Sequence, residues 1–267
     1  MNGFQALVLG TVQGLTEFLP ISSTAHLRLV PYFLGWEDPG AAASAVIQLG
    51  TLAAVFVYFA RDIGHLTAAA VDGLRHGSFN HTPQSRLAWA IIPGTLPIAA
   101  LGLGFRDFIE NGARSLPLIA GALIVLALFL VVAELVGQRH RTMADLGFWH
   151  IQFIGVCQAL ALVPGCSRSG STIMGGLFAG LERHDAAYFS FLLSLPAVGA
   201  AGALELVDLL EGGLAGEGLA NLGIAVLAAG VSGYLSIGFL LRYLQRHATY
   251  LFVVYRILLG LVIVFTL

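Results

Sequence analysis

The chain has 267 residues, of which 57% are hydrophobic and only 10% charged, and its mean hydropathy is +0.85. A soluble protein would need more charged side chains on its surface, so the composition indicates an integral membrane protein. The formal net charge is -2, and the basic residues are arginines dispersed between apolar segments, which gives no basis for nucleic-acid binding. Cys157 and Cys166 do not form a disulfide framework. The first apolar segment lacks a preceding basic region and is expected to belong to the mature protein.

Six stretches are long and apolar enough to cross a hydrocarbon core of about 30 Å. They are residues 43–60, 87–105, 115–136, 185–206, 219–241 and 249–267.

Two further apolar regions are broken in the middle. Residues 4–34 are interrupted by Pro20 and the hydroxyls after it, and residues 148–181 by Pro164-Gly165 and a Ser/Arg cluster. Broken backbone at membrane depth is tolerated only where protein or a water-filled cavity satisfies it, so both regions are predicted to be re-entrant helical hairpins. The longest polar connection, residues 62–86, is interpreted as a linker.

The distribution of arginine predicts the topology. Arginines lie in the connections after the first, third and fifth spans, whereas residues 205–217 contain four acidic residues and no basic one. By the positive-inside rule, the arginine-bearing connections are cytoplasmic and the acidic one is outside. Six crossings fit this only if residues 4–34 enter from the outside and residues 148–181 from the inside, with both termini outside.

A sequence echo supports two related units. Pro20-Ile-Ser-Ser-Thr and Pro164-Gly-Cys-Ser-Arg-Ser are 144 positions apart, and each follows a glutamine, Gln13 or Gln158. The predicted fold class is an all-α integral membrane protein with six transmembrane helices and two re-entrant helical hairpins in an inverted-topology repeat. We expect one polytopic domain over residues 1–267, with pseudo-repeats of about 1–136 and 148–267. A binding site is expected near the midplane, where the broken helices meet.

The first break carries candidate groups for acid–base chemistry. Gln13 and Glu17 are four positions apart, so on a helix they share a face and could supply oxygen ligands to Mg²⁺ or Ca²⁺. Alternatively, they bond backbone amides freed by Pro20. Ser22 and Ser23 are suited to cap the next helix, and the sequence does not separate a capping serine from a catalytic one. His26 is a candidate base, acid or nucleophile, or else a hydrogen-bonded core residue.

The second break has the composition of an anion-binding loop. Arg168 offers a planar fork that matches phosphate oxygens, and a helix expected near residues 171–181 would point its N-terminal amides into the site. The other candidate groups are glycines and hydroxyls: Gly165, Ser167, Ser169, Gly170, Ser171 and Thr172. The sequence lacks the Gly-Lys-[Ser/Thr] of an ATP-binding loop. The alternative is a Ser/Gly hinge in which Arg168 pairs with a carboxylate, and Glu17 is a conceivable partner.

Both segments resemble a known family. Gln13-Gly-Leu-Thr-Glu-Phe-Leu-Pro-Ile-Ser-Ser-Thr-Ala-His26 and Pro164-Gly-Cys-Ser-Arg-Ser-Gly-Ser-Thr172 are similar to the signature segments of the bacterial undecaprenyl-diphosphate phosphatases, or bacitracin-resistance proteins. The resemblance implies hydrolysis of the terminal phosphate of undecaprenyl diphosphate, which recycles the lipid carrier for peptidoglycan synthesis and confers bacitracin resistance. It also implies a divalent cation, Mg²⁺ or Ca²⁺, and a multi-pass protein of the bacterial inner membrane with its site facing the periplasm.

The family's functional residues fall on matching positions of this chain. The resemblance assigns catalysis to Glu17, Ser23 and His26, and metal binding to Glu17 with Gln13, although Gln13 stands at one position of the family's acidic pair. Diphosphate binding falls on Arg168, together with Ser167, Ser169, Gly170 and Thr172. The nucleophile, whether Ser23, His26 or water, is left open.

The expected partners are a polyprenyl diphosphate lipid, entering from the outer leaflet, and membrane lipid, with no nucleic acid; a homodimer is left open. The rival function is a transporter or flippase of the carrier lipid or of a phosphorylated solute, because inverted repeats and broken helices are also a transporter's construction. A structural membrane subunit would not explain why Glu17, His26 and Arg168 are kept at depth.

Overall fold

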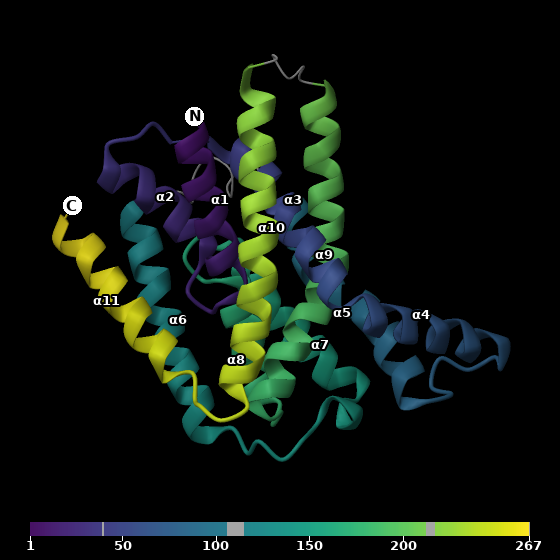
Figure 1. The fold of residues 1–267 in the computed structure, drawn as a ribbon. Coiled ribbons are helices and arrows are strands. Elements are labelled where there is room, and N and C mark those ends of the chain that lie inside the picture. Colours follow the sequence, from purple (N-terminus) through teal and green to yellow (C-terminus); the bar gives the residue numbers. More distant parts are fainter. Residues whose placement is uncertain (39, 106–114, 212–216, 267) are drawn as a thin grey trace.

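The computed structural model describes residues 1–38, 40–105, 115–211 and 217–266, and every regular element in these ranges is helical (Figure 1). An isolated bridge joins Arg141 and Leu181. The elements are α1 (Gly3–Phe18), α2 (Ser23–Leu34), α3 (Gly40–Tyr58), α4 (Ala60–Arg75), α5 (Pro83–Gly104), α6 (Leu116–Val136), η2 (Met143–Asp145), α7 (Phe148–Ala159), η3 (Leu160–Leu162), α8 (Arg168–Phe178), α9 (Arg183–Glu211), α10 (Glu217–Leu244) and α11 (Tyr250–Thr266).

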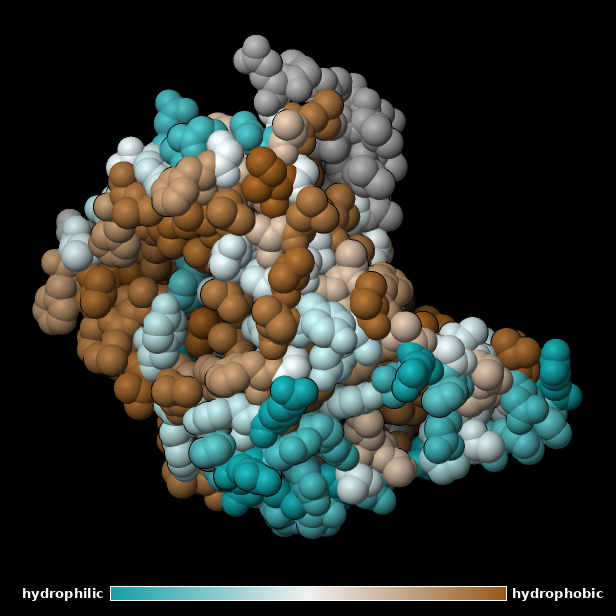
Figure 2. Space-filling view, viewed as in Figure 1, coloured by the Kyte–Doolittle hydropathy of each residue, from teal (hydrophilic) through white to brown (hydrophobic). Residues whose placement is uncertain are grey.

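Several helices have the length and composition of membrane spans. Within the described residues, α5, α6 and residues 218–244 of α10 are long and apolar enough to cross a bilayer, and α11 and residues 148–162 are shorter apolar helices. Apolar side chains cover much of the face shown in Figure 2, whereas hydrophilic ones gather at its lower end and along the projecting α4. These features define a multi-pass membrane protein.

The prediction that residues 62–86 form a linker is wrong. Residues 60–75 form α4, which is bent by 69° from α3 and projects from the bundle (Figure 1). Ile63 and Leu66 pack against the main core, while Arg61 and His65 are exposed. This two-sided pattern lets the helix form despite its charged residues, because its partly buried apolar side chains pack against the core.

The acidic stretch was also misassigned as a connection. The backbone of α9 continues as a helix to Glu211, so the predicted span of residues 185–206 is too short at its C-terminal end. Residues 212–216 of the expected acidic connection lie outside the described residues.

Both predicted helix breaks are confirmed. The chain leaves α1 after Phe18 and enters α2 at Ser23, and it leaves η3 after Leu162 and enters α8 at Arg168. The helix expected at about residues 171–181 therefore begins and ends three residues earlier. Pro20 and Pro164 interrupt the two hairpins because proline cannot donate a backbone hydrogen bond and clashes with the preceding turn.

Each broken hairpin packs against a helix from the other half of the chain. In α1, a Cβ added at Gly10 would lie 2.2 Å from the carbonyl oxygen of Ala225 in α10. In α7, a Cβ at Gly155 would lie 2.0 Å from the carbonyl oxygen of Gly94 in α5. Glycine is needed at both crossings because only it lets the backbones approach this closely.

Glu134, in the last turn of α6, holds one end of the bundle together, and its side chain is fully buried. Its carboxylate pairs with Arg183 at 2.8 Å and with Arg139 at 3.2 Å, and it accepts hydrogen bonds from the backbone and hydroxyl of Thr249. These contacts join α6 to the start of α9 and to the connection before α11. Because every partner belongs to this end of the bundle, Glu134 is a structural carboxylate.

Candidate active site

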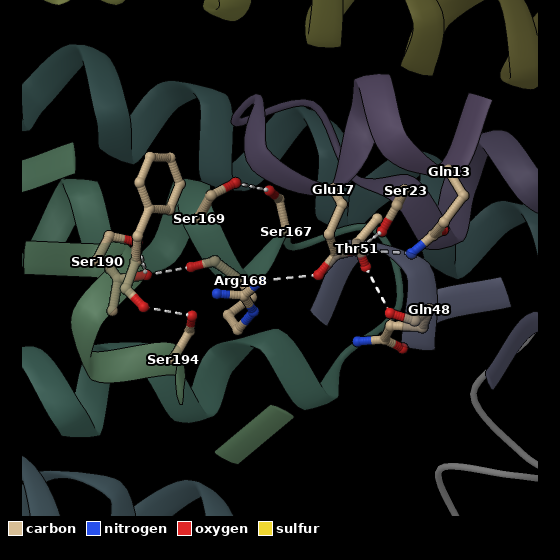
Figure 3. Close-up of polar contacts among 12 residues, drawn as sticks. Gln13, Glu17, Ser23, Gln48, Thr51, Ser167, Arg168, Ser169, Ser190 and Ser194 are labelled. Carbon is tan, nitrogen blue, oxygen red and sulfur yellow. Dashed lines mark hydrogen bonds and ion pairs between the residues drawn. The ribbon is translucent and has the colours of Figure 1, made fainter. Parts of the chain in front are cut away.

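The two helix breaks meet at an ion pair between residues that are 151 positions apart. Arg168 Nη2, in the first turn of α8, lies 2.8 Å from Glu17 Oε1, in the last turn of α1 (Figure 3). The pair borders a cavity of about 230 Å³. Side chains and backbone from both breaks and from α3, α5 and α9 line it: Glu17, Ser22, Ser23, Thr24, Gln48, Ile98, Ala161, Leu162, Gly165, Ser167, Arg168, Ala197 and Val198.

The second carboxylate oxygen of Glu17 accepts hydrogen bonds from polar side chains in and before the first break. Glu17 Oε2 accepts a hydrogen bond from Ser23 Oγ at 2.6 Å and one from Gln13 Nε2 at 3.1 Å. Gln13 Oε1 is buried and has no hydrogen-bond partner among the described residues. One carboxylate thus holds a hydroxyl, an amide and a guanidinium, and an acceptor oxygen beside it is left free.

Arg168 has only part of its hydrogen-bonding capacity used. Its Nη1 is buried and lacks a hydrogen-bond partner within the described part of the chain. A buried donor without a partner is costly, by about 1–3 kcal/mol, so such groups commonly mark a position that a ligand completes. Arg168 Nη1 is therefore available to donate a hydrogen bond to a bound anion.

The two helices that follow the breaks begin with the same strained cap. Ser22 and Ser167 are the N-cap residues of α2 and α8, with φ of 75° and 67°, in the left-handed region that most side chains avoid. Their hydroxyls accept from the backbone N–H groups of Ala25 and Gly170. This conformation turns the chain sharply, and it places Ser23 and Arg168 at the first position of each helix.

Three residues predicted to bind diphosphate are hydrogen-bonded to neighbouring parts of the protein. Ser169 Oγ donates to the carbonyl of Leu19 at 3.0 Å, and Gly170 N–H is used by the Ser167 cap. Thr172 Oγ1 donates to the Arg168 carbonyl and accepts from Ser190 Oγ. Ser169, Gly170 and Thr172 are not among the residues that line the cavity, whereas Ser167 and Arg168 are.

His26 lies on α2 but is engaged away from Ser23. Its Nδ1 is 2.7 Å from the Ser22 carbonyl oxygen and its Nε2 is 2.6 Å from the Tyr255 hydroxyl. The two rings stack, with centroids 5.6 Å apart. Nδ1 donates to the carbonyl, and in the neutral imidazole Nε2 then accepts from the tyrosine hydroxyl. His26 does not line the cavity.

Arg256 is a site component that sequence reasoning did not single out. It is fully buried, yet its guanidinium donates to the carbonyls of four residues: Pro20, Ala122, Leu123 and Gly165. Pro20 and Gly165 belong to the two helix breaks. Arg256 therefore satisfies carbonyls that the breaks leave without helical partners and fixes the breaks relative to each other. The only sequence signal was an arginine within an apolar span.

Several other polar residues lie near the two breaks. Gln48, in α3, lines the cavity. Arg28 pairs with Asp38 at the protein surface. Gln158 and Ser171 are buried, and their side-chain polar atoms have no protein partner in the described ranges.

The fold and the site define a class of membrane protein in which two broken helical hairpins enclose a small polar cavity. Comparison with known proteins identifies the family. A family profile described as "Bacitracin resistance protein BacA" matches residues 6–262, so the chain belongs to this family.

Curated relatives agree over nearly the full length of the chain. A protein of Chlorobium phaeobacteroides (strain BS1) named "Undecaprenyl-diphosphatase" is 54% identical over 97% of this chain and 95% of its own. Proteins of the same name from Myxococcus xanthus (strain DK1622) and Chlorobaculum tepidum are 53% and 51% identical over 98% of this chain and 88% and 95% of their own.

Proposed function

We propose that this protein is an undecaprenyl-diphosphate phosphatase, which hydrolyses undecaprenyl diphosphate to undecaprenyl phosphate and inorganic phosphate. Family membership and the relatives' name support the reaction. The observation that carries the assignment to a site is the contact between Glu17 and Arg168 at the edge of the polar cavity. The reaction returns the lipid carrier to peptidoglycan synthesis, and bacitracin resistance follows from it.

The charges suit an anionic substrate only if the ion pair opens. A buried pair of this kind is costly to desolvate and gains little stability overall, so a dianionic phosphate can compete with the carboxylate for the guanidinium. Arg168 Nη1 is already without a protein partner and Nη2 would be released by the exchange. The bidentate fork of Arg168, together with Ser167 beside it, is assigned to the diphosphate oxygens.

The residues around Glu17 fit a hard divalent cation. Carboxylate and amide oxygens are the ligands that Mg²⁺ and Ca²⁺ prefer, and the buried Gln13 Oε1 lacks a protein partner next to Glu17. Glu17 and Gln13 would hold the ion, even though the amide brings no charge. When bound, the cation supplies positive charge that stabilises the transferring phosphoryl group.

The hydrogen bonds favour Ser23 as the nucleophile and Glu17 as its base. Ser23 Oγ already donates to Glu17 Oε2 at 2.6 Å, whereas both ring nitrogens of His26 are engaged elsewhere. The hydroxyl proton passes to Glu17 as Oγ bonds to the terminal phosphorus. The bond from that phosphorus to the bridging oxygen breaks, lipid monophosphate leaves, and water then hydrolyses the phosphoserine. His26 is assigned a positioning role through the backbone of Ser22.

The membrane arrangement is part of the same proposal. In this proposal α3, α5, α6, α9, α10 and α11 cross the inner membrane and the two hairpins are re-entrant, with the termini and the site on the periplasmic side. The equivalent breaks and the reciprocal packing of α1 on α10 and α7 on α5 support two inverted repeats. The polyprenyl chain then stays in the outer leaflet while the diphosphate enters the cavity.

The test is phosphate release from undecaprenyl diphosphate by purified protein in detergent with Mg²⁺. Wild-type protein is expected to turn over without any gradient, and Arg168→Ala should lower kcat by about 10²–10³-fold, as removal of one charged stabilising group does in other enzymes. Gradient-independent turnover separates a phosphatase from a transporter. Normal phosphate release by Arg168→Ala would contradict the anion-site assignment while leaving the activity itself established.

A further inference from the structure

A group of metal-ligating side chains lies far from the cavity, at the outer end of the projecting α4. Asp72 and His76 are four positions apart on this helix, and His81 returns to them just before α5. His76 Nδ1 lies 3.5 Å from Asp72 Oδ1, and His81 Nε2 lies 3.6 Å from Asp72 Oδ2. One ligand atom from each residue falls within 4.8 Å of the other two.

These separations are close to what a small metal ion requires. Bonds of about 2.0–2.1 Å to a tetrahedral Zn²⁺ place ligand atoms about 3.4 Å apart. The three side chains are 37–54% exposed, so an ion can reach them and keep water in a fourth position. Two imidazoles and a carboxylate suit Zn²⁺, Co²⁺ or Ni²⁺ better than Mg²⁺, which prefers oxygen ligands.

The turn that presents the cluster is tied to the helix it follows. Ser78 N–H donates to the Gly73 carbonyl at 2.9 Å, and Ser85 Oγ donates to the Phe79 carbonyl at 3.2 Å. A side chain at Gly73 would collide with Ser85 Oγ, at 2.2 Å, so α4 and the start of α5 pack closely here. The returning segment therefore holds His81 near Asp72 without a metal.

We propose that Asp72, His76 and His81 form a surface site for a late first-row divalent metal ion, separate from the reaction cavity. The ion would join the last turn of α4 to the segment that enters α5 and so brace the projecting hairpin. Binding replaces existing contacts: His76 Nδ1 gives up its hydrogen bond to the Asp72 carbonyl, and the rings of His76 and His81 leave their stack, whose centroids are 4.1 Å apart. This proposal does not depend on the phosphatase activity.

The experiment is a Co²⁺ titration of the full chain, purified in detergent with a tag that contains no histidine and stripped of metal. Saturating Mg²⁺ is present throughout to occupy oxygen-ligand sites. We expect one equivalent of Co²⁺ per chain with visible d–d absorption, displaced by Zn²⁺. His81→Ala and the milder His81→Gln should each weaken binding by at least about tenfold, a loss typical of disturbed metal sites.

Two matched variants make the result specific. His65→Ala removes an exposed histidine from the same helix but outside the cluster, and Glu17→Gln alters the reaction cavity. Both should bind Co²⁺ as the wild-type protein does. Unchanged binding in His76→Ala and His81→Ala would overturn the proposal, as would half an equivalent per chain with metal-dependent dimerisation.

Discussion

The two helix breaks share a backbone plan but carry different chemistry. Ser22 and Ser167, 145 positions apart, cap their helices in the same left-handed conformation. At the next position the first break has Ser23 and the second has Arg168. Glu17 has Leu162 as its counterpart at the same offset. The same backbone conformation thus places a carboxylate and a hydroxyl on one side of the cavity and a guanidinium on the other.

The difference shows why both halves are needed. A lone Glu17 or a lone Arg168 at this depth would be an uncompensated buried charge, which costs several kcal/mol. Paired across the breaks, each charge stabilises the other until a substrate separates them. The serine caps that the two breaks share hold the backbone, and Ser167 also faces the cavity beside Arg168. The groups that differ, Glu17, Ser23 and Arg168, divide the chemistry between the two sides.

Exchanging the charges between the breaks should have the largest effect. Arg168→Glu alone leaves two carboxylates in contact and should destabilise the protein by about 3–5 kcal/mol. The double variant Glu17→Arg with Arg168→Glu restores the ion pair and should recover much of the melting temperature. Its kcat should still fall by at least about 10³-fold, because the carboxylate base no longer lies beside Ser23 and the anion-binding guanidinium has moved to the first break. Thermal unfolding and phosphate release measure the two effects. An active double variant would contradict the division of chemistry between the breaks.

Ser23→Ala is expected to lower kcat by more than about 10³-fold with a small change in melting temperature, because the nucleophile is lost while the Arg168 pair keeps Glu17 in place. Rapid quenching followed by mass spectrometry of the wild-type protein should detect a phosphorylated peptide containing Ser23. Thr24→Ala is the matched control, since Thr24 also lines the cavity. A phosphohistidine at His26 instead would reverse the assignment.

Arg256→Gln tests the link between the breaks. It removes the guanidinium from four carbonyls, of which those of Pro20 and Gly165 lie outside the helices and are left without a donor. Each unsatisfied carbonyl costs about 1–3 kcal/mol, so we expect a loss of at least about 2 kcal/mol of unfolding free energy. The kcat should fall as well, because the two breaks shift. Arg256→Lys should recover part of both, whereas a normal melting temperature for Arg256→Gln would show that the breaks hold without it.

Tyr255→Phe removes the hydroxyl that contacts His26 Nε2. Losing this hydrogen bond should raise the activation free energy by about 1 kcal/mol, which is roughly a fivefold fall in kcat. His26→Gln should have an effect of similar or larger size. If the two residues act as one unit, the double variant will be no worse than His26→Gln alone. If the losses of kcat in the two single variants add in the double variant, the two residues act independently.

The smallest effect is expected at the shared caps. Ser22→Ala and Ser167→Ala should each lower stability by about 1 kcal/mol, because the cap is lost while the left-handed strain persists. Glycine at either position should cost less than alanine, since it adopts positive φ without strain. Melting temperatures of the four variants test this, and a preference for alanine over glycine would contradict the cap geometry.

The sequence predicted the breaks and the charged groups that meet there, because proline and buried polar residues leave strong local signals. The pairing of Arg168 with Glu17, raised as an alternative, is present in the structure. Local patterns could not assign Ser169 and Thr172 to backbone contacts, since a hydroxyl that caps and one that binds a ligand have the same sequence. Arg256 was missed because its partners are carbonyls from distant segments. The helix α4 was missed because its glycines and histidines suggested a loop, although its apolar residues keep a helical period.

The glycine crossings of α1 and α7 also constrain how the protein is made. Gly10 reaches its close contact only after Ala225 has been synthesised, so the first hairpin spends most of translation without the helix it packs against. The second hairpin, by contrast, emerges when α5 is already present. The N-terminal half must therefore enter the membrane in an incomplete form, and the cavity closes only when the last third of the chain arrives. A ribosome stalled before α10 would leave α1, and with it Glu17, without the helix against which Gly10 packs.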